Sequence, residues 1–285
     1  MTQKLLALYG LKWNPFSADV PVEALWRFPK LEHFCWRIEG QVREGGFALI
    51  TGDPGTGKSV ALRIVANHLH DLPDVQVGVL TRPQSALADF YREMGQLFGV
   101  ALVPHNRWGG FKALRHRWTT HVEATRHRPV LLVDEAQEVA PSVLAELRIL
   151  ASTDFDSRSI LTTVLCGDAR LTQQFRREEL LPIASRIRVR LNLDYLTPKD
   201  LLDWLLHALD QAGAPQLMTP ELMTTLTEHA AGNLRVLATM GNDLLTLGAK
   251  REIATLDHKL YFEAFAPPPR TRTAAQASAA TIARS

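Results

Sequence analysis

Cysteine is scarce in this sequence, which holds only Cys35 and Cys166 among 285 residues. Two thiols this far apart are too few for a disulfide scaffold or a zinc cluster, so the cysteine content fits a reducing compartment. A bond between the two is the alternative. Long apolar runs are also absent: none approaches the roughly 20 residues that span a bilayer, and the first ten residues lack the apolar region of a secretory signal. We therefore expect a cytoplasmic protein with no membrane contact.

A surplus of one charge sign is missing too. The 32 lysines and arginines nearly balance the 30 aspartates and glutamates, which leaves a formal net charge of +2. This balance excludes a wholly basic nucleic-acid coat protein but permits a local basic patch. With 46% hydrophobic residues, the chain can bury the core of one large domain or of two modest ones.

Short apolar runs alternate with helical patterns up to about residue 196. Such alternation predicts an α/β fold, in which a parallel sheet is covered by helices on both faces. The expected strands are 47–51, 75–80, 130–133, 159–166 and 187–193, and the expected helices are 25–42, 60–70, 85–98, 111–126 and 140–151.

From Thr197 onward the pattern is purely helical. The segment 197–200 begins with a capping threonine and a first-turn proline and ends with an acid, which is typical of a helix start. We predict an α/β domain over 1–196 and a small all-helical lid domain over 197–265. Three prolines at 267–269 end the regular pattern, so the mildly basic tail 266–285 is expected to be disordered.

A glycine-rich loop lies between the first predicted strand and the helix after it, and it fits the pattern G-x-x-x-x-G-K-[ST]. Its glycines let successive backbone N–H groups point at phosphates, and the helix start adds the positive end of its dipole. Lys58 is expected to reach the β- and γ-phosphates of ATP, and Ser59 to ligate Mg²⁺. A chance glycine-rich turn is the alternative. The predicted nucleotide-binding residues here are Gly52, Asp53, Pro54, Gly55, Thr56, Gly57, Lys58, Ser59 and Val60.

Two acids, Asp134 and Glu135, follow the apolar run 131–133. Carboxylates at the carboxyl end of a buried parallel strand lie where α/β sheets bind ligands. We expect Asp134 to hold the Mg²⁺ shell and Glu135 to orient and deprotonate the attacking water. A solvated acidic turn is the alternative.

These motifs, together with the leading segment Gly10-Leu11-Lys12-Trp13-Asn14-Pro15-Phe16 and the run Leu132-Val133-Asp134-Glu135-Ala136-Gln137, resemble AAA+ ATPases of the ExeA type. The resemblance extends to the transposition ATPases TniB and TnsC, and more distantly to MuB, and it covers roughly residues 5 to 250. It implies an AAA+ fold, ATP hydrolysis with Mg²⁺, and assembly into a homo-oligomer, as a ring or a filament.

The resemblance also implies roles for residues outside the two motifs. Asn14, Pro15 and Phe16 would line the adenine pocket. Arg235, in Gly232-Asn233-Leu234-Arg235, matches the sensor-2 position that ties the lid to the γ-phosphate.

Two further positions follow from the same resemblance. Arg186 matches the arginine finger that completes a neighbour's site, with Arg188 as the alternate; a surface residue or an intrachain ion pair is the alternative reading. Asp168 lies where a sensor-1 polar residue is expected, although an acid there would repel the γ-phosphate unless Mg²⁺ or an arginine intervenes.

The densest basic and aromatic cluster spans 107–117. Lys112, Arg115 and His116 fall near one helix face, and with Arg107 they form a candidate contact to DNA phosphates. The alternative is a solvated helix face with Trp108 and Trp118 packed inward.

We weighed three functions. The first is a transposition helper, an ATP-dependent oligomer on double-stranded DNA that selects targets and recruits a transposase. The second is an ExeA-type ATPase of secretion and envelope assembly, which is disfavoured because no membrane segment or cell-wall-binding region follows the lid. The third is a nucleotide switch that acts on a protein partner without DNA.

Overall fold

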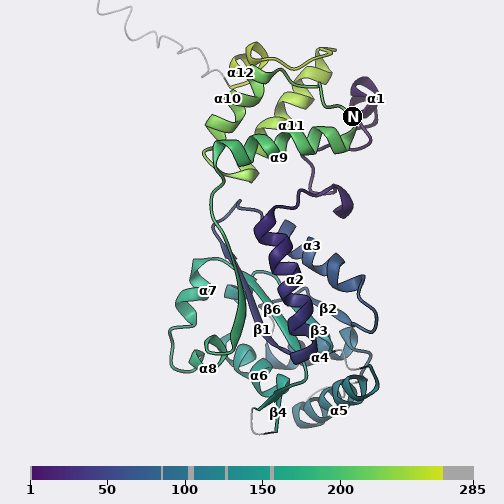
Figure 1. The fold of residues 1–285 in the computed structure, drawn as a ribbon, viewed down its shortest axis with the longest axis vertical. Helices are drawn as coiled ribbons and strands as arrows, with labels where there is room; N and C mark the ends of the chain where they lie inside the picture. Colours follow the sequence, from purple (N-terminus) through teal and green to yellow (C-terminus); the bar gives the residue numbers. More distant parts are fainter. Residues whose placement is uncertain (1, 85, 102–105, 126–127, 155–156, 266–285) are drawn as a thin grey trace, which may run out of the picture.

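A five-stranded parallel sheet in the order β2-β3-β6-β1-β7 organises the larger part of the molecule (Figure 1). All neighbouring strands in it run parallel, which confirms the predicted α/β class. The computed structural model describes residues 2–84, 86–101, 106–125, 128–154 and 157–265. The strands are β1 (Gly46–Gly52), β2 (Val77–Leu80), β3 (Val130–Val133), β6 (Thr162–Gly167) and β7 (Ile187–Leu193), and a separate antiparallel pair is formed by β4 (Ser152–Thr153) and β5 (Arg158–Ser159).

Helices cover both faces of this sheet, so its inner strands are buried on two sides and read as unbroken apolar runs. In β3, Leu131 and Val133 face one hydrophobic cluster, whereas Val130 and Leu132 face the other. The first cluster includes side chains of α4 (Leu87–Leu97), α5 (Arg107–Thr125), α6 (Pro141–Ala151), α7 (Ala169–Gln174) and α8 (Leu181–Ala184), and the second those of α2 (Pro29–Glu44) and α3 (Lys58–His70).

A smaller helical unit lies above the carboxyl ends of the strands in Figure 1 and has its own hydrophobic cluster. It begins at Thr197, which caps the first helix with the predicted capping box. Two later helices begin at capping side chains of Thr219 and Asn233. The helices are α9 (Pro198–Ala212), α10 (Pro220–Ala230), α11 (Leu234–Lys250) and α12 (His258–Phe265).

The start of the chain packs with this lid and not with the sheet. Leu5 of α1 (Thr2–Tyr9), Leu11 and Phe16 belong to the lid's hydrophobic cluster, and Figure 1 shows α1 beside the lid helices. The α/β domain was predicted to span 1–196, but the first residues of that span pack with the lid. The apolar stripe of so short a helix gives no indication in sequence of which domain it joins.

Other boundaries also differ from the sequence predictions. The helix expected over 25–42 begins at Pro29, whose ring suits the first turn, and a 3₁₀ turn η1 (Val22–Ala24) precedes it. The strand expected over 159–166 is divided into β5 and β6. A second 3₁₀ turn, η2 (Ala136–Glu138), follows the acidic pair. The predicted tail 266–285 lies outside the described residues.

Candidate nucleotide-binding site

The glycine-rich loop joins β1 to α3 as predicted. Gly55 and Gly57 have φ angles of 87° and 95°, a left-handed conformation that favours glycine. The side chain of Lys58 is buried, and its Nζ donates to the carbonyl oxygens of Gly52 (2.9 Å) and Asp53 (3.1 Å). The ammonium group is therefore held under the loop, where an anion cradled by the loop would meet it.

Close packing around the loop also requires glycine. A Cβ at Gly52 would lie 2.6 Å from the carbonyl oxygen of Leu193, and one at Gly55 would lie 2.2 Å from Oδ1 of Asn233. Leu193 ends the edge strand and Asn233 caps α11 of the lid. The loop is thus clamped between the sheet and the lid.

A cavity of about 640 Å³ opens beside this loop, a size typical of small-molecule sites. It brings together three parts of the chain that lie far apart in sequence: the loop with α3, the amino-terminal segment, and the lid. The predicted residues among its lining are Asn14, Pro15, Phe16, Gly55, Gly57, Lys58, Ser59, Val60, Glu135 and Arg235.

The amino-terminal segment is fixed to the lid at this cavity. Asn14 donates from Nδ2 to Oδ1 of Asn242 (2.8 Å), and its own Oδ1 accepts from the backbone N–H of Phe16 (3.0 Å). The Phe16 ring lies 6.5 Å from that of Trp204, and a Cβ at Gly241 would approach it to 2.7 Å. The predicted adenine-contacting residues therefore form a wall of the cavity that is bound to the lid.

The acidic pair lies at the carboxyl end of β3, as predicted. Glu135 has φ 49° and ψ 41°, a left-handed conformation that is uncommon for a side-chain-bearing residue and is concentrated at functional sites. Its carboxylate accepts a hydrogen bond from Nε2 of Gln137. Gln137 is itself buried, and its Oε1 accepts from the backbone N–H of Asp168 (3.2 Å). One amide thus links Glu135 to the end of β6.

The pKa values of Cys166 and Asp168, which lie beside the acidic pair, are shifted by their surroundings. Burial, together with the adjacent Asp134 carboxylate, raises the pKa of the Cys166 thiol, which therefore stays protonated. Hydrogen bonds from Arg170 lower the pKa of Asp168, and Arg170 also pairs with Glu138 at 2.9 Å. An arginine therefore accompanies the acid at the expected sensor-1 position. Cys35 and Cys166 are both free thiols.

The lid touches the loop through the start of α11. Asn233 donates from Nδ2 to the carbonyl oxygen of Pro54 (3.2 Å), while its Oδ1 caps the helix. The backbone N–H of Arg235 lies 3.4 Å from the carbonyl oxygen of Gly55. The exposed Arg235 side chain lines the cavity, so the structure brings it to the glycine-rich loop as the resemblance implies.

Arg186 does not join this cavity. It precedes β7, at the opposite end of the sheet from the glycine-rich loop, and its guanidinium donates to the carbonyl oxygen of Pro182. Seven residues of strand separate the two ends, which amounts to roughly 20 Å. Arg186 therefore cannot reach a nucleotide held by its own chain, and a role in hydrolysis requires a neighbouring chain.

The predicted DNA-contacting residues on α5 are largely occupied within the chain. Arg107 pairs with the buried carboxylate of Glu146, which also accepts from the Tyr91 hydroxyl. Burial and this carboxylate raise the pKa of Tyr91. Arg115 donates to carbonyl oxygens at the end of α6, namely those of Ile149, Leu150 and Ser152.

The other α5 candidates remain on the surface. Lys112 lies 5.0 Å from the ring centroid of Trp108, which stacks on Phe111, and His116 is exposed. Trp118 is buried, but Trp108 is 63% exposed, so only one of the two tryptophans packs inward. Arg107 and Arg115 have structural partners, which argues against a continuous phosphate-binding face made of all four residues.

The donor set at the loop fits Mg²⁺ bound together with a nucleotide. Magnesium takes one or two protein oxygens and completes its shell with phosphate and water. Ser59 lines the cavity, and the Asp134 carboxylate and the Lys58 ammonium both act on the pKa of the Cys166 thiol, so the two oxygen donors that would hold Mg²⁺ lie at the same end of the sheet. The ion would neutralise phosphate charge.

Gln137 and Asn233 lie within the sequence motifs, but the motifs predict no role for them. No sequence pattern points to Asn242 or Trp204. Nothing in a lone glutamine or asparagine indicates what it will contact. The signal that could have found Asn233 is its place between the glycine and the first turn of α11, because asparagine is a preferred cap.

The chain matches the family described as "AAA domain" over residues 42–175. It is 30% identical over 238 residues to General secretion pathway protein A of Aeromonas hydrophila; the match covers 80% of this chain and 42% of that protein, so the chain spans less than half the length of this relative.

Two solved structures share the fold. The ADP form of the Aeropyrum pernix ORC2 protein has a TM-score of 0.69 at 14% identity, covering 88% of this chain and 71% of that one. The Aeropyrum pernix ORC1 protein in complex with DNA has a TM-score of 0.64 at 16% identity, covering 88% and 67%. With the glycine-rich loop, the acidic strand end and the lid in place, the chain is a P-loop ATPase with the AAA+ fold, and it is similar to the ExeA type.

Proposed function

We propose that this ATPase is an ATP-dependent, oligomerising protein that acts on double-stranded DNA. The single observation that carries the proposal is the composition of the nucleotide cavity, whose walls come from the sheet, the lid and the lid-bound amino-terminal segment. A nucleotide held there binds both domains at once. It therefore favours one position of the lid on the sheet, and the lid position can set how neighbouring chains pack.

Each chain is proposed to supply part of its neighbour's site. Lys58 binds the β- and γ-phosphates, Ser59 and Asp134 hold Mg²⁺, Glu135 orients the attacking water, and Arg235 connects the γ-phosphate to the lid. Arg186 completes the site in trans, which fits its place far from its own loop. An arginine supplied in trans is worth about 10³–10⁵ in rate, so hydrolysis depends on assembly.

The cellular role that we propose is that of a transposition helper, which selects a DNA target and recruits a transposase. Support for DNA as the partner comes from the shared fold with a protein solved in complex with DNA. The match to General secretion pathway protein A favours a second role in secretion or envelope assembly. No helix among the described residues is long and apolar enough to cross a membrane.

A mixing experiment tests the proposal. Lys58→Ala subunits keep Arg186 but cannot engage phosphate, whereas Arg186→Ala subunits keep their own loop. Each is expected to be nearly inactive alone, and a mixture is expected to recover ATPase activity. Arg92→Ala, which removes an exposed arginine paired with Asp89, is the matched control and should behave as wild type. A mixture that stays inactive would exclude Arg186 as a trans-acting residue.

The ATPase rate measured with and without duplex DNA distinguishes a DNA-dependent role from a role with a protein partner. For the wild type we expect an ATPase rate that rises with protein concentration and with duplex DNA, and that falls with salt because phosphate contacts release counterions. A rate indifferent to DNA would remove DNA from the proposal and favour a protein partner, with the ATPase itself unaffected.

A further inference from the structure

A second phosphate-binding surface is indicated at the amino end of the sheet, away from the nucleotide cavity. A cleft of about 380 Å³ opens there, and its lining includes Arg43, Arg128, Arg148, Arg158, Arg186 and Arg188. Among the described residues of that lining, Glu44 is the acidic one, and Arg158 also pairs with Asp154 at 3.5 Å just outside it. In a chain whose net charge is only +2, six guanidinium groups around one cleft still give it a positive local field.

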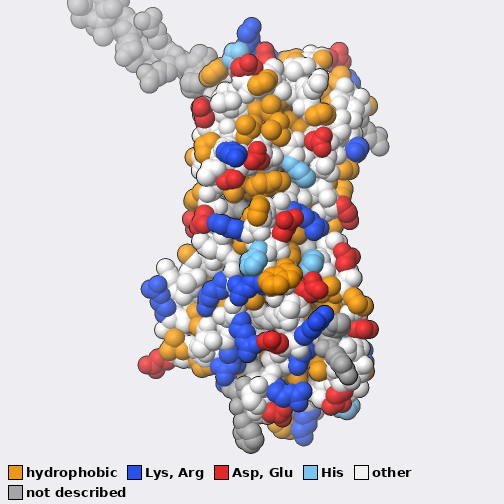
Figure 2. Space-filling view, viewed as in Figure 1, with side chains coloured by type: hydrophobic (Ala, Val, Ile, Leu, Met, Phe, Trp, Pro, Cys, Tyr) orange, Lys and Arg blue, Asp and Glu red, His pale blue; other side chains and the backbone are white. Residues whose placement is uncertain are grey.

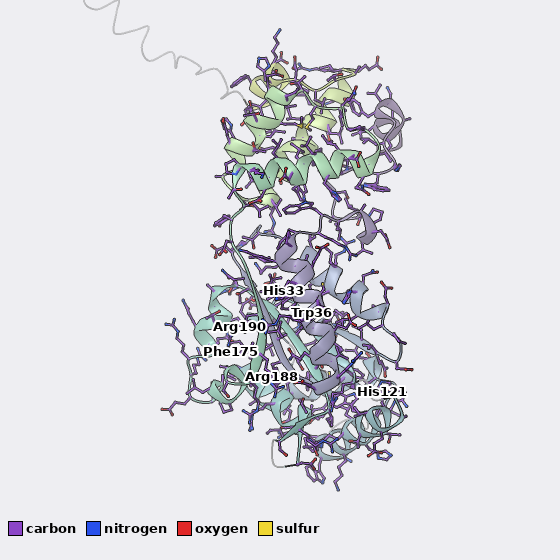
Figure 3. The ribbon with its side chains drawn as sticks, in the orientation of Figure 1. His33, Trp36, His121, Phe175, Arg188 and Arg190 are labelled. Atoms are coloured by element: carbon purple, nitrogen blue, oxygen red, sulfur yellow. The ribbon has the colours of Figure 1, made fainter. Side chains whose placement is uncertain are left out.

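This cleft continues into a second one between α2 and β7, of about 400 Å³, with which it shares Arg43, Glu44 and Arg188. The second cleft adds Trp36, Arg37 and Glu39, whose carboxylate lies 3.5 Å from Nε2 of His68, and it has no lining residue in common with the nucleotide cavity. Figure 3 labels Trp36 and Arg188 on the same face of the molecule, together with His33 of α2 and Arg190 of β7. Figure 2 shows basic side chains gathered on this face.

A β-bulge creates the join between the two clefts. Phe47 of β1 pairs with Ile187 and the next residue pairs with Val189, so Arg188 is the extra residue on the edge strand. Its carbonyl oxygen accepts a hydrogen bond from Nη2 of Arg37 at 3.0 Å. Bulges redirect side chains at sheet edges, and this one lets Arg188 reach toward the end of α2, where it meets Glu44 at 2.6 Å.

Arg37, Arg188 and Arg190 can still meet an anion. The Arg188–Glu44 pair is exposed on both sides, 63% and 68%, and exposed pairs of this kind contribute little to stability. Arg37 and Arg190 donate to backbone carbonyls, and no carboxylate of the described residues forms an ion pair with either. A phosphate can therefore displace the weak pair and gain several charge-assisted hydrogen bonds.

An exposed aromatic pair borders the arginines. Trp36 is 68% exposed, and its ring lies 5.7 Å from that of His33, stacked at 30°. Arginines on an edge strand also protect the edge from pairing with other strands, but that role requires neither Trp36 nor Arg43, both of which belong to α2. A positively charged groove with an aromatic beside it is the arrangement that nucleic-acid-binding surfaces use.

We infer that the α2–β7 face binds the phosphate backbone of DNA. Arg43, Arg188 and Arg190 would contact phosphates, and Trp36 would pack against the deoxyriboses of the duplex backbone. This inference rests on the proposed function, since it assigns a surface to the DNA contact, and it moves that contact away from α5.

The experiment measures binding of a fluorescent duplex by anisotropy across salt concentration, with full-length protein at a dilution where it does not assemble. The double variant Arg43→Gln/Arg190→Gln is expected to lose about tenfold in affinity, and the slope of log K against log salt is expected to fall by about 2. Trp36→Ala is expected to lose about twofold to fivefold, because the apolar contact with the sugars is removed. Thermal melts establish that each variant is folded.

Matched controls come from α5. Arg117→Gln removes another exposed arginine and Trp108→Ala removes a tryptophan of similar exposure, 63% against 68%, and both should bind the duplex as wild type does. If the α5 variants lose affinity and the α2–β7 variants do not, the inference is wrong while the DNA-binding function stands.

Two other outcomes also decide the question. If the α2–β7 variants fail to assemble with ATP in the absence of DNA, yet bind the duplex as wild type does, then this face contacts a second copy of the chain and the inference is overturned. If the wild-type protein binds no duplex at any salt concentration, neither at that dilution nor when assembled with ATP, the proposed function itself fails, and the inference fails with it.

Discussion

The two ends of the sheet offer different chemical groups to a phosphate. At the carboxyl end, glycines of one continuous loop present backbone N–H groups, and the buried ammonium of Lys58 lies beneath them. At the amino end, exposed guanidinium groups come from α2, β5 and β7, and half-buried ones come from Arg128, Arg148 and Arg186. The first arrangement fixes one ligand in one pose. The second suits a repeating anion that can slide across it.

The largest effect is expected at Glu135, the proposed general base. Glu135→Gln should lower the rate of ATP hydrolysis by about 10²–10⁴, because the amide cannot accept the proton of the attacking water. Nucleotide binding should be retained, since the loop is unchanged. Single-turnover hydrolysis and a fluorescent-nucleotide titration measure the two quantities. Glu138→Gln, one turn further on, is the control, and an equal loss there would contradict the assignment.

One added methyl group tests whether the glycine-rich loop needs its backbone conformation to bind a nucleotide. Gly55→Ala should weaken nucleotide binding at least about tenfold, since the residue needs a positive φ and its Cβ would meet Asn233. Gly99→Ala also has a positive φ, of +66°, but its Cβ would meet nothing within 4 Å. Titration of both variants separates the contact with the lid from backbone strain alone. Equal affinities would show that the Asn233 contact does not matter.

A third test asks whether Arg107 of α5 binds DNA or stabilises the fold through Glu146. Arg107→Ala should lower the free energy of unfolding by about 1–2 kcal/mol, because it leaves the buried Glu146 carboxylate without its cationic partner. Arg117→Ala should change it by less than about 0.5 kcal/mol. Urea denaturation measures both. A loss of DNA affinity in folded Arg107→Ala protein would return α5 to the binding surface.

The smallest effect is expected at the edge between β6 and α7. Arg170 lowers the pKa of Asp168, so this acid stabilises the fold above its unfolded pKa of about 3.9, and the contribution is lost as the pH falls through the lower folded value. Asp168→Asn keeps a capping oxygen but removes that dependence. Urea denaturation between pH 7 and pH 3 should show a smaller acid-induced loss in the variant. Identical profiles would mean that the pair does not affect stability.

The difference between the two ends also explains what could be predicted. Residues 52–59 are contiguous, so one pattern with a strand before it and a helix after it was enough to predict the loop. The same holds for Asp134 and Glu135 at the end of β3, and for the strands at 130–133 and 187–193, which are correct to the residue.

The arginines of the amino end come from distant segments, and only folding brings Arg43 close to Arg188. The bulge at Arg188 has no sequence pattern. On α5 the sequence predicted a DNA-contacting face because Arg107 and Arg115 are close in sequence. In the structure, Arg107 pairs with Glu146 and Arg115 donates to carbonyl oxygens at the end of α6. Charge density along a sequence does not reveal which charges have partners across the fold.

The packing of α1 into the lid has a consequence for synthesis. Leu5 and Leu245 share one hydrophobic cluster although almost the whole chain lies between them. A ribosome releases the amino-terminal segment before it translates the lid surface that receives it. The sheet can fold before α1 has its partner, in keeping with domains that fold as units during translation. Because Asn14 and Phe16 belong to that segment, the nascent chain completes its glycine-rich loop early and its nucleotide pocket only after the lid has been translated.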